Sequence, residues 1–471
     1  MSLFLIGDSI TLTLLVFLIL IFSYYVYNLR TNNIFRRIGI PGPAPIPLLG
    51  ELFNAMRRGM YKNDVALIKK YGKIVGIYEG ITPIILVTDP DILRNVLIKD
   101  CHVFVNRRVI EGGAGPFEHG LTMLKDEQWK NARSIVSPTF SVAKLKAMHS
   151  LMNDVSDMYN ERLLEYADKQ EIFDIKTING QYTLDIIASC LFGVETNSLK
   201  NENIILINHL KKFFTLTLTR IFLLFILIAR RRQCLERRND FIQMMIDHEE
   251  EIKDQEVGQQ SKSLRKTLSD KEILSQALVF LAAGYETSNV LMSFFFYVMA
   301  TEPVIQEKIY QEIRQEIGDN EVTYEKLNQL QYLDMVINET LRMYPPVLRL
   351  DRVASKDYQL GNYLIPKGTI IHAPVYPIHH DSEAWPEPEK SYLKAEKAKR
   401  HPMAFLPFGE GPRNCIGMRF ALVEAKLGIV RALRLVEFER CGKTEVPLQL
   451  GKIIVLNSKN SIFLRVIRRS Q

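Results

Sequence analysis

The arrangement of apolar and polar residues along the chain predicts a mainly helical protein. Residues 10–27 carry no charge and are nearly all apolar, which is long enough to span a bilayer with slight tilt. Residues 269–300 are apolar on nearly every side, and the capping-box sequence Ser269-Asp-Lys-Glu272 at their start predicts a long buried helix. Residues 418–435 have apolar side chains at helical spacing, and most of residues 125–250 also follow a helical pattern.

A small β region is predicted beside these helices. Residues 73–87 have the pattern of two strands around a Glu79-Gly80 turn, and Asp89-Pro90 then opens a helix. Residues 358–373 predict short strands joined by glycine-containing turns. The expected fold class is therefore mainly α with a small β region.

The N-terminal part of the chain predicts a membrane protein with a cytosolic body. Residues 1–29 form an anchor, which we expect to stay uncleaved because no small-residue cleavage site follows it. Three arginines between residues 30 and 37 lie on its C-terminal side, so the positive-inside rule leaves the body in the cytosol. Residues 30–50 form a basic, proline-rich hinge, and residues 51–471 form one further domain.

A second apolar block, residues 213–229, contains Arg220 near its middle. An arginine at the centre of a bilayer is costly. We therefore expect an amphipathic element that dips into the membrane face, with a second membrane span as the less favoured alternative.

Composition narrows the function classes. Hydrophobic residues make up 47% of the chain and charged residues 24%, which is an ordinary globular balance with ample core. The net charge of +7 suits an anionic membrane face or an acidic partner protein, but it is too mild and too dispersed to indicate nucleic acid. The five cysteines are odd in number and widely spaced, which argues against a disulfide scaffold and a zinc site.

The candidate chemistry lies in residues 408–417. Cys415 follows a glycine-rich loop and directly precedes a predicted helix, whose dipole and main-chain N–H groups favour a thiolate. Arg413 supplies a fixed cation for an anionic group nearby. Such a loop is suited to holding an iron through sulfur, with the arginine meeting a haem propionate. A lone cysteine is more often a buried structural residue, but the Phe-x-x-Gly-x-Arg-x-Cys-x-Gly spacing favours the ligand.

This loop resembles the haem-thiolate signature of the cytochrome P-450 monooxygenases. The resemblance extends from about Pro41 to about Ile462 and is closest to the animal microsomal branch that contains drug- and steroid-oxidising enzymes. It implies a cytochrome P-450 fold in which residues 51–471 bind haem b, with Cys415 as the iron ligand and Phe408 among the haem contacts.

The same resemblance implies an activity and its partners. The enzyme would insert one oxygen atom from O2 into a lipophilic substrate that is steroid-, lipid- or xenobiotic-like. Electrons would come from an NADPH-dependent flavoprotein reductase that docks on the basic face near the cysteine loop. The expected location is the endoplasmic reticulum membrane, with a single-pass anchor and a cytosolic catalytic domain. Residues 107–121 and 197–225 are expected to line the substrate pocket.

The segment Ala283-Gly-Tyr-Glu-Thr287 interrupts the long apolar helix. A glycine in the middle of a helix costs about 1 kcal/mol relative to alanine, and a buried Glu-Thr pair needs partners. The segment resembles the oxygen-activation motif of the family. The resemblance implies that Gly284 opens room over the haem, that Thr287 donates a hydrogen bond to bound dioxygen and that Glu286 relays protons. The alternative is a helix kink with a solvated glutamate.

Further haem contacts follow from the resemblance. Trp129 and Arg133 have the Trp-x-x-x-Arg spacing of the family's propionate-binding helix, which places both side chains on one face. Arg352 and Arg107 match further propionate-binding arginines, and charge-assisted bonds from arginine suit two buried carboxylates. For Arg107, a solvated surface arginine is an equally open interpretation.

The chain departs from the family pattern at one element. Glu339-x-x-Arg342, on a helix expected from about Gln331, matches the buried ion pair that stabilises the core around the haem loop. The Pro-Glu-Arg-Phe tetrad that supplies a third member is absent before residue 402, and Lys394 offers no planar fork in its place. Removing one member of a buried charge cluster typically costs about 3–5 kcal/mol, so weakened haem binding or a gene-model error near residues 215–240 and 391–399 is expected.

Two alternative functions therefore remain. One is a degenerate haem-binding family member with impaired catalysis, which the missing tetrad favours. The other is a haem-thiolate isomerase or dehydratase that needs neither O2 nor reductase, against which the Glu286-Thr287 pair argues.

Overall fold

The computed structural model describes residues 13–26, 34–46, 49–109, 115–200, 268–388, 400–451 and 455–469. Helices predominate in this part of the chain and are accompanied by two small sheets and a hairpin. The predicted fold class, mainly α with a small β region, is confirmed. The apolar block at residues 213–229 and Lys394 lie outside the described residues.

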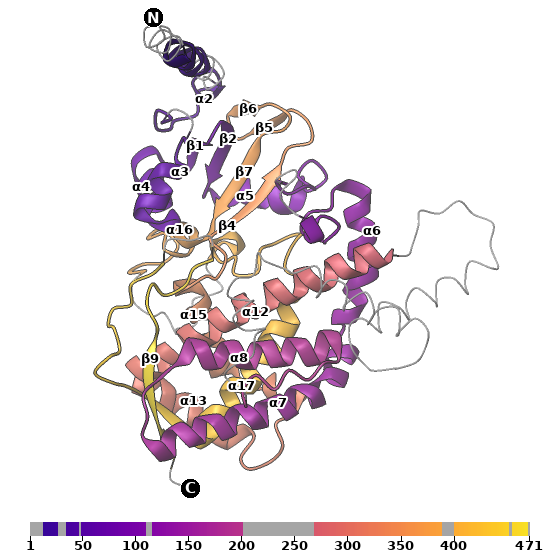
Figure 1. Ribbon diagram of the computed structural model, residues 1–471, viewed down its shortest axis with the longest axis vertical. Helices are drawn as coiled ribbons and strands as arrows, with labels where there is room; N and C mark the ends of the chain where they lie inside the picture. Colours follow the sequence, from indigo (N-terminus) through magenta and orange to yellow (C-terminus); the bar gives the residue numbers. More distant parts are fainter. Residues whose placement is uncertain are drawn as a thin grey trace, which may run out of the picture.

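The molecule has a β-rich end and a helical end (Figure 1). The main sheet has the order β1-β2-β7-β4, in which β2 and β7 run parallel while the other neighbours are antiparallel. A hairpin of two short strands accompanies it. The strands at this end are β1 (Ile74–Glu79), β2 (Thr82–Val87), β4 (Arg349–Val353), β5 (Tyr358–Leu360), β6 (Tyr363–Ile365) and β7 (Ile370–Pro374).

The short helices of the β-rich end lie around this sheet. They are α2 (Ile34–Ile38), α3 (Leu52–Arg58), α4 (Met60–Tyr71), α5 (Pro90–Arg94) and α16 (Val375–His379). The predicted turn between β1 and β2 and the helix start at Asp89 are confirmed, since the Asp89 side chain accepts a 3.0 Å hydrogen bond from the Ile92 main chain. The strands predicted within residues 358–373 are present as well.

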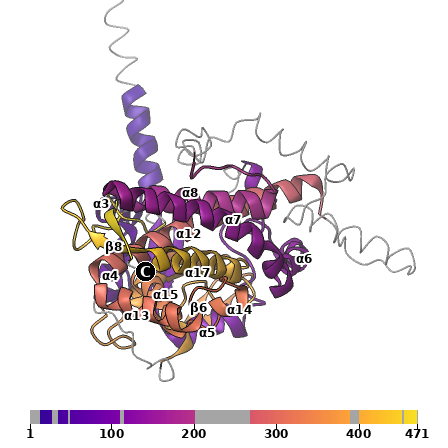
Figure 2. The same cartoon turned by 90° about the horizontal axis from the view of Figure 1, so that it is seen from below.

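The helical end is centred on α12 (Asp270–Thr301), which packs against α8 (Ile175–Ile187), α15 (Gln331–Met343) and α17 (Met418–Leu435). Figure 2 shows α17 near the centre of the view, with α7 and α8 beside it. The other helices are α6 (Asp126–Val136), α7 (Val142–Lys169), α13 (Pro303–Glu316) and α14 (Tyr324–Leu327). A second sheet, in the order β3-β9-β8, consists of Phe173–Asp174, Phe463–Arg468 and Val436–Arg440.

The long helix α12 forms as its sequence predicts. The Ser269 hydroxyl accepts from the Glu272 main chain, and the Glu272 carboxylate accepts from the Ser269 main chain at 2.8 Å, which completes the capping box. Phe294, Phe295 and Phe296 are almost fully buried in the core. Within the described residues α12 is the one helix that is long and apolar enough to cross a membrane. Its most apolar stretch is 67% buried, as expected for a core helix.

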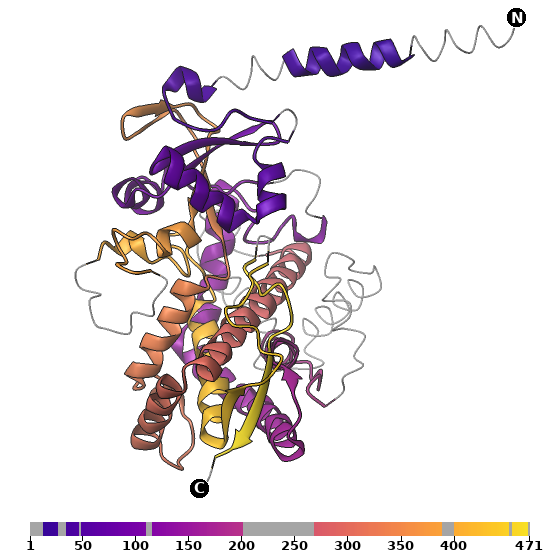
Figure 3. The ribbon, with the colours of Figure 1, turned by 90° about the vertical axis from the view of Figure 1, so that its left-hand side faces the viewer.

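A short apolar helix, Thr13–Val26, stands away from the body of the molecule (Figure 3). Its large apolar side chains are exposed, among them Phe17 at 60% and Phe22 at 65%. This helix lies within the predicted anchor but is shorter than a full membrane span. The single-pass anchor therefore stays a prediction.

Candidate functional site

The candidate site is a cavity where the middle of α12 meets the loop before α17. Helix α6, the segment around Arg107 and the start of β4 complete its wall. Eight residues to which the sequence analysis gave a role line this cavity: Arg107, Trp129, Arg133, Gly284, Thr287, Phe408, Arg413 and Cys415. Residues far apart in the sequence thus meet as the resemblance implied.

The loop that carries Cys415 is held in a tight conformation. The Cys415 main-chain N–H donates to the Phe408 carbonyl at 2.8 Å, which closes the loop. Gly411 has φ +75°, and a Cβ there would lie 1.8 Å from the carbonyl oxygen of Leu97. Only glycine fits this position, because the left-handed backbone and the close approach each exclude a side chain. The loop therefore presents the Cys415 side chain to the cavity.

The electrostatics of Cys415 differ from the sequence prediction. Burial raises the pKa of the thiol, although the Gly417 main-chain N–H and the charges of Arg107 and Arg133 lower it in part. Desolvation is the largest of these effects and favours the neutral thiol. A metal ion reverses this balance, because a coordinating thiol is deprotonated. The position suits a metal ligand better than a freely reactive thiolate.

Four arginines crowd the side of the cavity near the cysteine loop. The guanidinium of Arg413 donates to the main-chain oxygens of Val105, Leu121 and Leu124 at 2.8–3.1 Å. It lies 4.0 Å from the ring centroid of Trp129. Main-chain oxygens and an aromatic face orient this cation, but neither neutralises it with a full negative charge.

The other three arginines are held in the same way. Arg133 donates to the main-chain oxygen and the side-chain oxygen of Asn414 at 2.9 and 3.0 Å. Arg107 donates from Nη2 to the Arg413 carbonyl at 3.0 Å, while its Nε is buried without a hydrogen-bond partner among the described residues. Arg352 donates to the main-chain oxygen of Asp351 at 2.7 Å.

This arginine cluster, Arg107, Arg133, Arg352 and Arg413, carries an excess of buried positive charge. Burial and the neighbouring arginines lower the pKa of Arg413 to about 9 and that of Arg352 to about 10. Such mutual repulsion costs free energy unless an anion enters. The cluster and the Arg107 Nε, which has no hydrogen-bond partner among the described residues, therefore suit a ligand with two carboxylates, as the resemblance implies for the haem propionates. Arg352 belongs to the cluster without lining the cavity.

Helix α12 supplies the opposite wall. The Thr287 hydroxyl lines the cavity and donates to the Ala283 carbonyl at 2.6 Å. Glu286 is not among the lining residues, and its carboxylate accepts a 2.9 Å hydrogen bond from the Asn457 side chain. A Cβ on Gly284 would lie 2.8 Å from Cδ1 of Ile187, so glycine brings α12 close to α8. Glu286 thus faces the C-terminal segment rather than the cavity.

The predicted Glu-x-x-Arg pair is buried and bidentate. Arg342 donates to the two carboxylate oxygens of Glu339 at 3.0 and 2.8 Å and to the His379 carbonyl at 3.0 Å. The guanidiniums of Arg342 and Arg400 lie 5.0 and 4.1 Å from the ring centroid of Trp385. A main-chain oxygen and an indole face therefore satisfy Arg342 among the described residues. Weakened haem binding stays a prediction.

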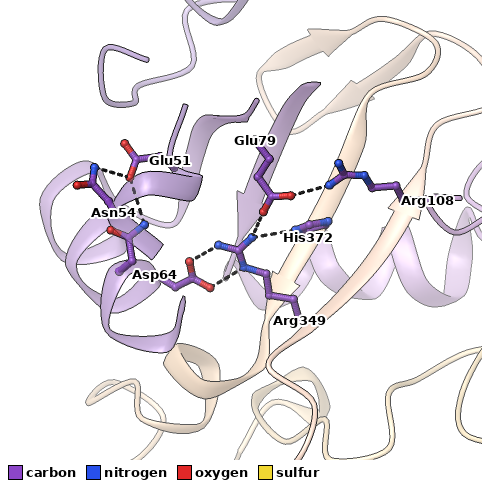
Figure 4. Close-up of polar contacts among 8 residues, drawn as sticks. Glu51, Asn54, Asp64, Glu79, Arg108, Arg349 and His372 are labelled. Atoms are coloured by element: carbon purple, nitrogen blue, oxygen red, sulfur yellow. Dashed lines mark hydrogen bonds and ion pairs between the residues drawn. The ribbon is translucent and has the colours of Figure 1, made fainter. Parts of the chain in front are cut away.

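A network of charged side chains joins the β-rich end to the cavity wall (Figure 4). Arg349 of β4 donates to Asp64 of α4 at 2.7 Å and to Glu79 of β1 at 2.5 Å. The other oxygen of Glu79 accepts from the Arg108 guanidinium at 2.6 Å, and the Arg108 main chain donates to Asp351 at 2.5 Å. Because Arg349 and Asp351 both line the cavity, this network connects the cavity wall to β1 and α4.

The sequence analysis missed two further polar residues of this region. Asn457 binds Glu286 from a segment 171 positions away, and no local pattern marks it. Glu424 binds Ser288 of the cavity wall from within α17. A signal for Glu424 existed, because a glutamate beside Val423 and Leu427 interrupts the apolar pattern of that helix.

Comparisons with known proteins agree with this geometry. The family model described as "Cytochrome P450" matches residues 40–465. Cytochrome P-450 3A5 from Homo sapiens is 37% identical and aligns with 94% of this chain and 94% of its own length. Cytochrome P-450 3A25 from Mus musculus is 36% identical, with 95% of each chain covered. Cytochrome P-450 3A18 from Rattus norvegicus is 36% identical over 95% of this chain and 96% of its own.

Proposed function

The chain belongs to the cytochrome P-450 family, and from this premise we propose that it oxidises a lipophilic steroid-, lipid- or xenobiotic-like substrate with electrons from NADPH. As a family member it is a haem-dependent oxidoreductase that incorporates oxygen from O2. The observation that carries the proposal is the shared cavity, which is lined by Cys415, by three arginines of the cluster and by Thr287.

The residues near the cysteine loop would hold the haem. Cys415 would be the iron ligand, the arginine cluster would bind the propionates, and Phe408 and Trp129, which line the cavity, would supply apolar contact. When bound, haem with a thiolate ligand supplies the activation of dioxygen, because the sulfur donates electron density to the iron. Losing the thiolate should therefore abolish the activation of dioxygen, although the other residues would still be able to contact a haem.

The α12 wall would control protons at the reacting end of the cavity. The Thr287 hydroxyl can exchange its hydrogen bond to the Ala283 carbonyl for one into the cavity. Glu286, held by Asn457, is the proposed acid that connects this hydroxyl to the outside. The apolar residues of the wall exclude bulk water, which keeps each proton transfer under the control of these side chains.

Membrane attachment supports the choice of partners. The exposed apolar helix Thr13–Val26 would anchor the protein in the endoplasmic reticulum membrane, with the catalytic domain in the cytosol. A membrane-bound flavoprotein reductase that uses NADPH could then reach the face near the cysteine loop. The lipophilic substrate would enter from the bilayer.

The first experiment is a carbon monoxide difference spectrum of the reduced, membrane-expressed protein and of Cys415→Ser. The strongly red-shifted Soret band of a thiolate haem is expected for the parent and not for the variant. Cys190→Ser, at a buried cysteine that does not line the cavity, is the matched control and should keep the band. A parent protein without that band would overturn the assignment and favour a degenerate family member.

A second experiment separates oxygenation from isomerisation or dehydration. Thr287→Ala should lower product formation while NADPH consumption with reductase continues, because the proton supply is impaired. Equal product formation by parent and variant without reductase or NADPH would instead favour the isomerase or dehydratase.

A further inference from the structure

A buried acid lies behind the α12 wall of the cavity. Glu424 of α17 has no exposed surface, and its Oε2 accepts a 2.8 Å hydrogen bond from the Ser288 hydroxyl. Ser288 directly follows Thr287 on α12 and lines the cavity. One hydroxyl group therefore separates this carboxyl group from the space in front of Cys415.

The second oxygen of the same carboxyl group is unsatisfied. Glu424 Oε1 is buried and has no hydrogen-bond partner among the described residues. Buried polar atoms are nearly always paired, and exceptions often serve a catalytic role or hold a water. A helix-to-helix clamp would need only the Ser288 contact, so the free oxygen indicates a further use.

Among the residues that the structure describes, no cation pairs with this acid. The hydroxyl of Tyr182, from α8, donates at 3.0 Å to the Glu424 main-chain oxygen and not to its carboxyl group. Tyr182 also shares a 3.2 Å hydrogen bond with Ser156 of α7. On α17 itself, Lys426 pairs with Asp334 and Arg431 pairs with Asp157.

Burial decides the charge of the acid. It raises the pKa of Glu424 to about 8, against the opposing effect of the Ser288 hydrogen bond. A carboxyl group in this environment holds its proton at neutral pH. The raised pKa therefore favours the neutral form of this buried carboxyl group, which Ser288 links to the cavity wall.

We propose that Glu424 keeps a proton beside the cavity and passes it to the reaction through the Ser288 hydroxyl. In the delivering state the carboxyl group donates to Ser288 Oγ, and the Ser288 hydroxyl points into the cavity. An acceptor there takes the Ser288 proton while Ser288 takes the Glu424 proton. The remaining carboxylate accepts the Ser288 hydrogen bond that the structure shows, and a hydronium ion from bulk solvent restores the carboxyl proton and leaves as water.

The inference rests on the proposed function, since it needs a reaction that consumes protons in the cavity. Reducing one atom of dioxygen to water does so. Glu424 acts through Ser288 and is therefore a positioning residue. Its role differs from that of Glu286, which connects to the C-terminal segment.

The first test reads the proton directly. The haem-loaded, full-length protein is compared by infrared spectroscopy with Glu424→Gln near pH 7. A carbonyl-stretch band of a neutral carboxylic acid should be present in the parent and absent in the variant. Identical spectra would refute the stored proton. This readout needs no turnover, so a parent protein that forms no product defeats the proposed function while the infrared band still decides the state of Glu424.

The second test measures turnover. Glu424→Gln and Ser288→Ala should each form product about tenfold more slowly, which is below the roughly hundredfold minimum usual for loss of a general acid because Glu286 remains. The fall in parent turnover as pH rises through about 8 should disappear in both variants. Ser293→Ala, at a buried serine of α12 that binds Asn289, is the matched control and should keep the parent pH profile.

The two variants keep the inference falsifiable. If Glu424→Gln fails to bind haem, Ser288→Ala decides alone, because it retains the acid and removes only the link. If Ser288→Ala formed product at the parent rate and with the parent pH profile, Glu424 would serve only to connect α12 to α17, and the proposal would be wrong.

Discussion

Replacing Glu424 by glutamine should remove a loss of folding stability that the parent protein undergoes as pH rises. The folded protein holds a proton on Glu424 up to about pH 8, because burial raises the pKa, whereas the unfolded chain releases it near 4.5. Between these values the unfolded state binds fewer protons, so rising pH favours unfolding. The contribution of this residue to stability is greatest below the unfolded pKa and is lost on the way to the folded one.

The size of the effect follows from linkage. Each pH unit within this window changes the free energy of unfolding by about 1.4 kcal/mol for one titrating group. From about pH 6 to about pH 8 the parent should therefore lose roughly 2–3 kcal/mol relative to Glu424→Gln. That is a large part of a typical stability of about 5–15 kcal/mol.

The assay is urea unfolding of the haem-loaded protein at several pH values, with the free energy taken from linear extrapolation. At each pH the free energy of unfolding of the variant is subtracted from that of the parent, because the contributions of the other titrating groups cancel in this difference. Glu161→Gln, at an exposed glutamate of α7, is the matched control and should give a pH-independent difference. A difference between parent and Glu424→Gln that is constant over this pH range would refute the buried, protonated carboxyl group.

Two further predictions concern the framework of the site. Gly411→Ala should abolish the haem-thiolate spectrum, because its Cβ would lie 1.8 Å from the Leu97 carbonyl oxygen, whereas Gly368→Ala, also at positive φ but with no atom within 4 Å, should cost only about 1 kcal/mol and keep the spectrum. Arg342→Leu should cost about 3–5 kcal/mol in urea unfolding, because it removes the guanidinium that makes two hydrogen bonds to the buried Glu339 carboxylate. A loss below about 1 kcal/mol would show that this pair contributes little.

Elements specified by local chemistry were predictable from the sequence. The capping box of α12, the Glu79-Gly80 turn and the Asp89 helix start all depend on residues within a few positions of one another. The cysteine loop was also recognisable, because its glycines and Arg413 act within ten residues of Cys415. Each of these features appears in the structure where the sequence indicated it.

Long-range pairings were not predictable in this way. Arg349 and Asp64 are 285 residues apart, and Arg107 and the Arg413 carbonyl are 306 apart. No spacing rule connects such positions, because the folded chain brings them together through the packing of whole elements. The resemblance to a family named the arginines, but not which main-chain oxygens would orient them.

The protonation of the site separates the two kinds of information most clearly. The amino-acid sequence alone placed Cys415 before a helix and Glu286 beside Thr287, since both depend on neighbours along the chain. Tertiary packing decided that burial raises the pKa of Cys415 and of Glu424 and that Glu286 binds Asn457. The physical reason is desolvation: the free energy of a charge depends on everything packed around it, and the chain supplies those neighbours only after it has folded.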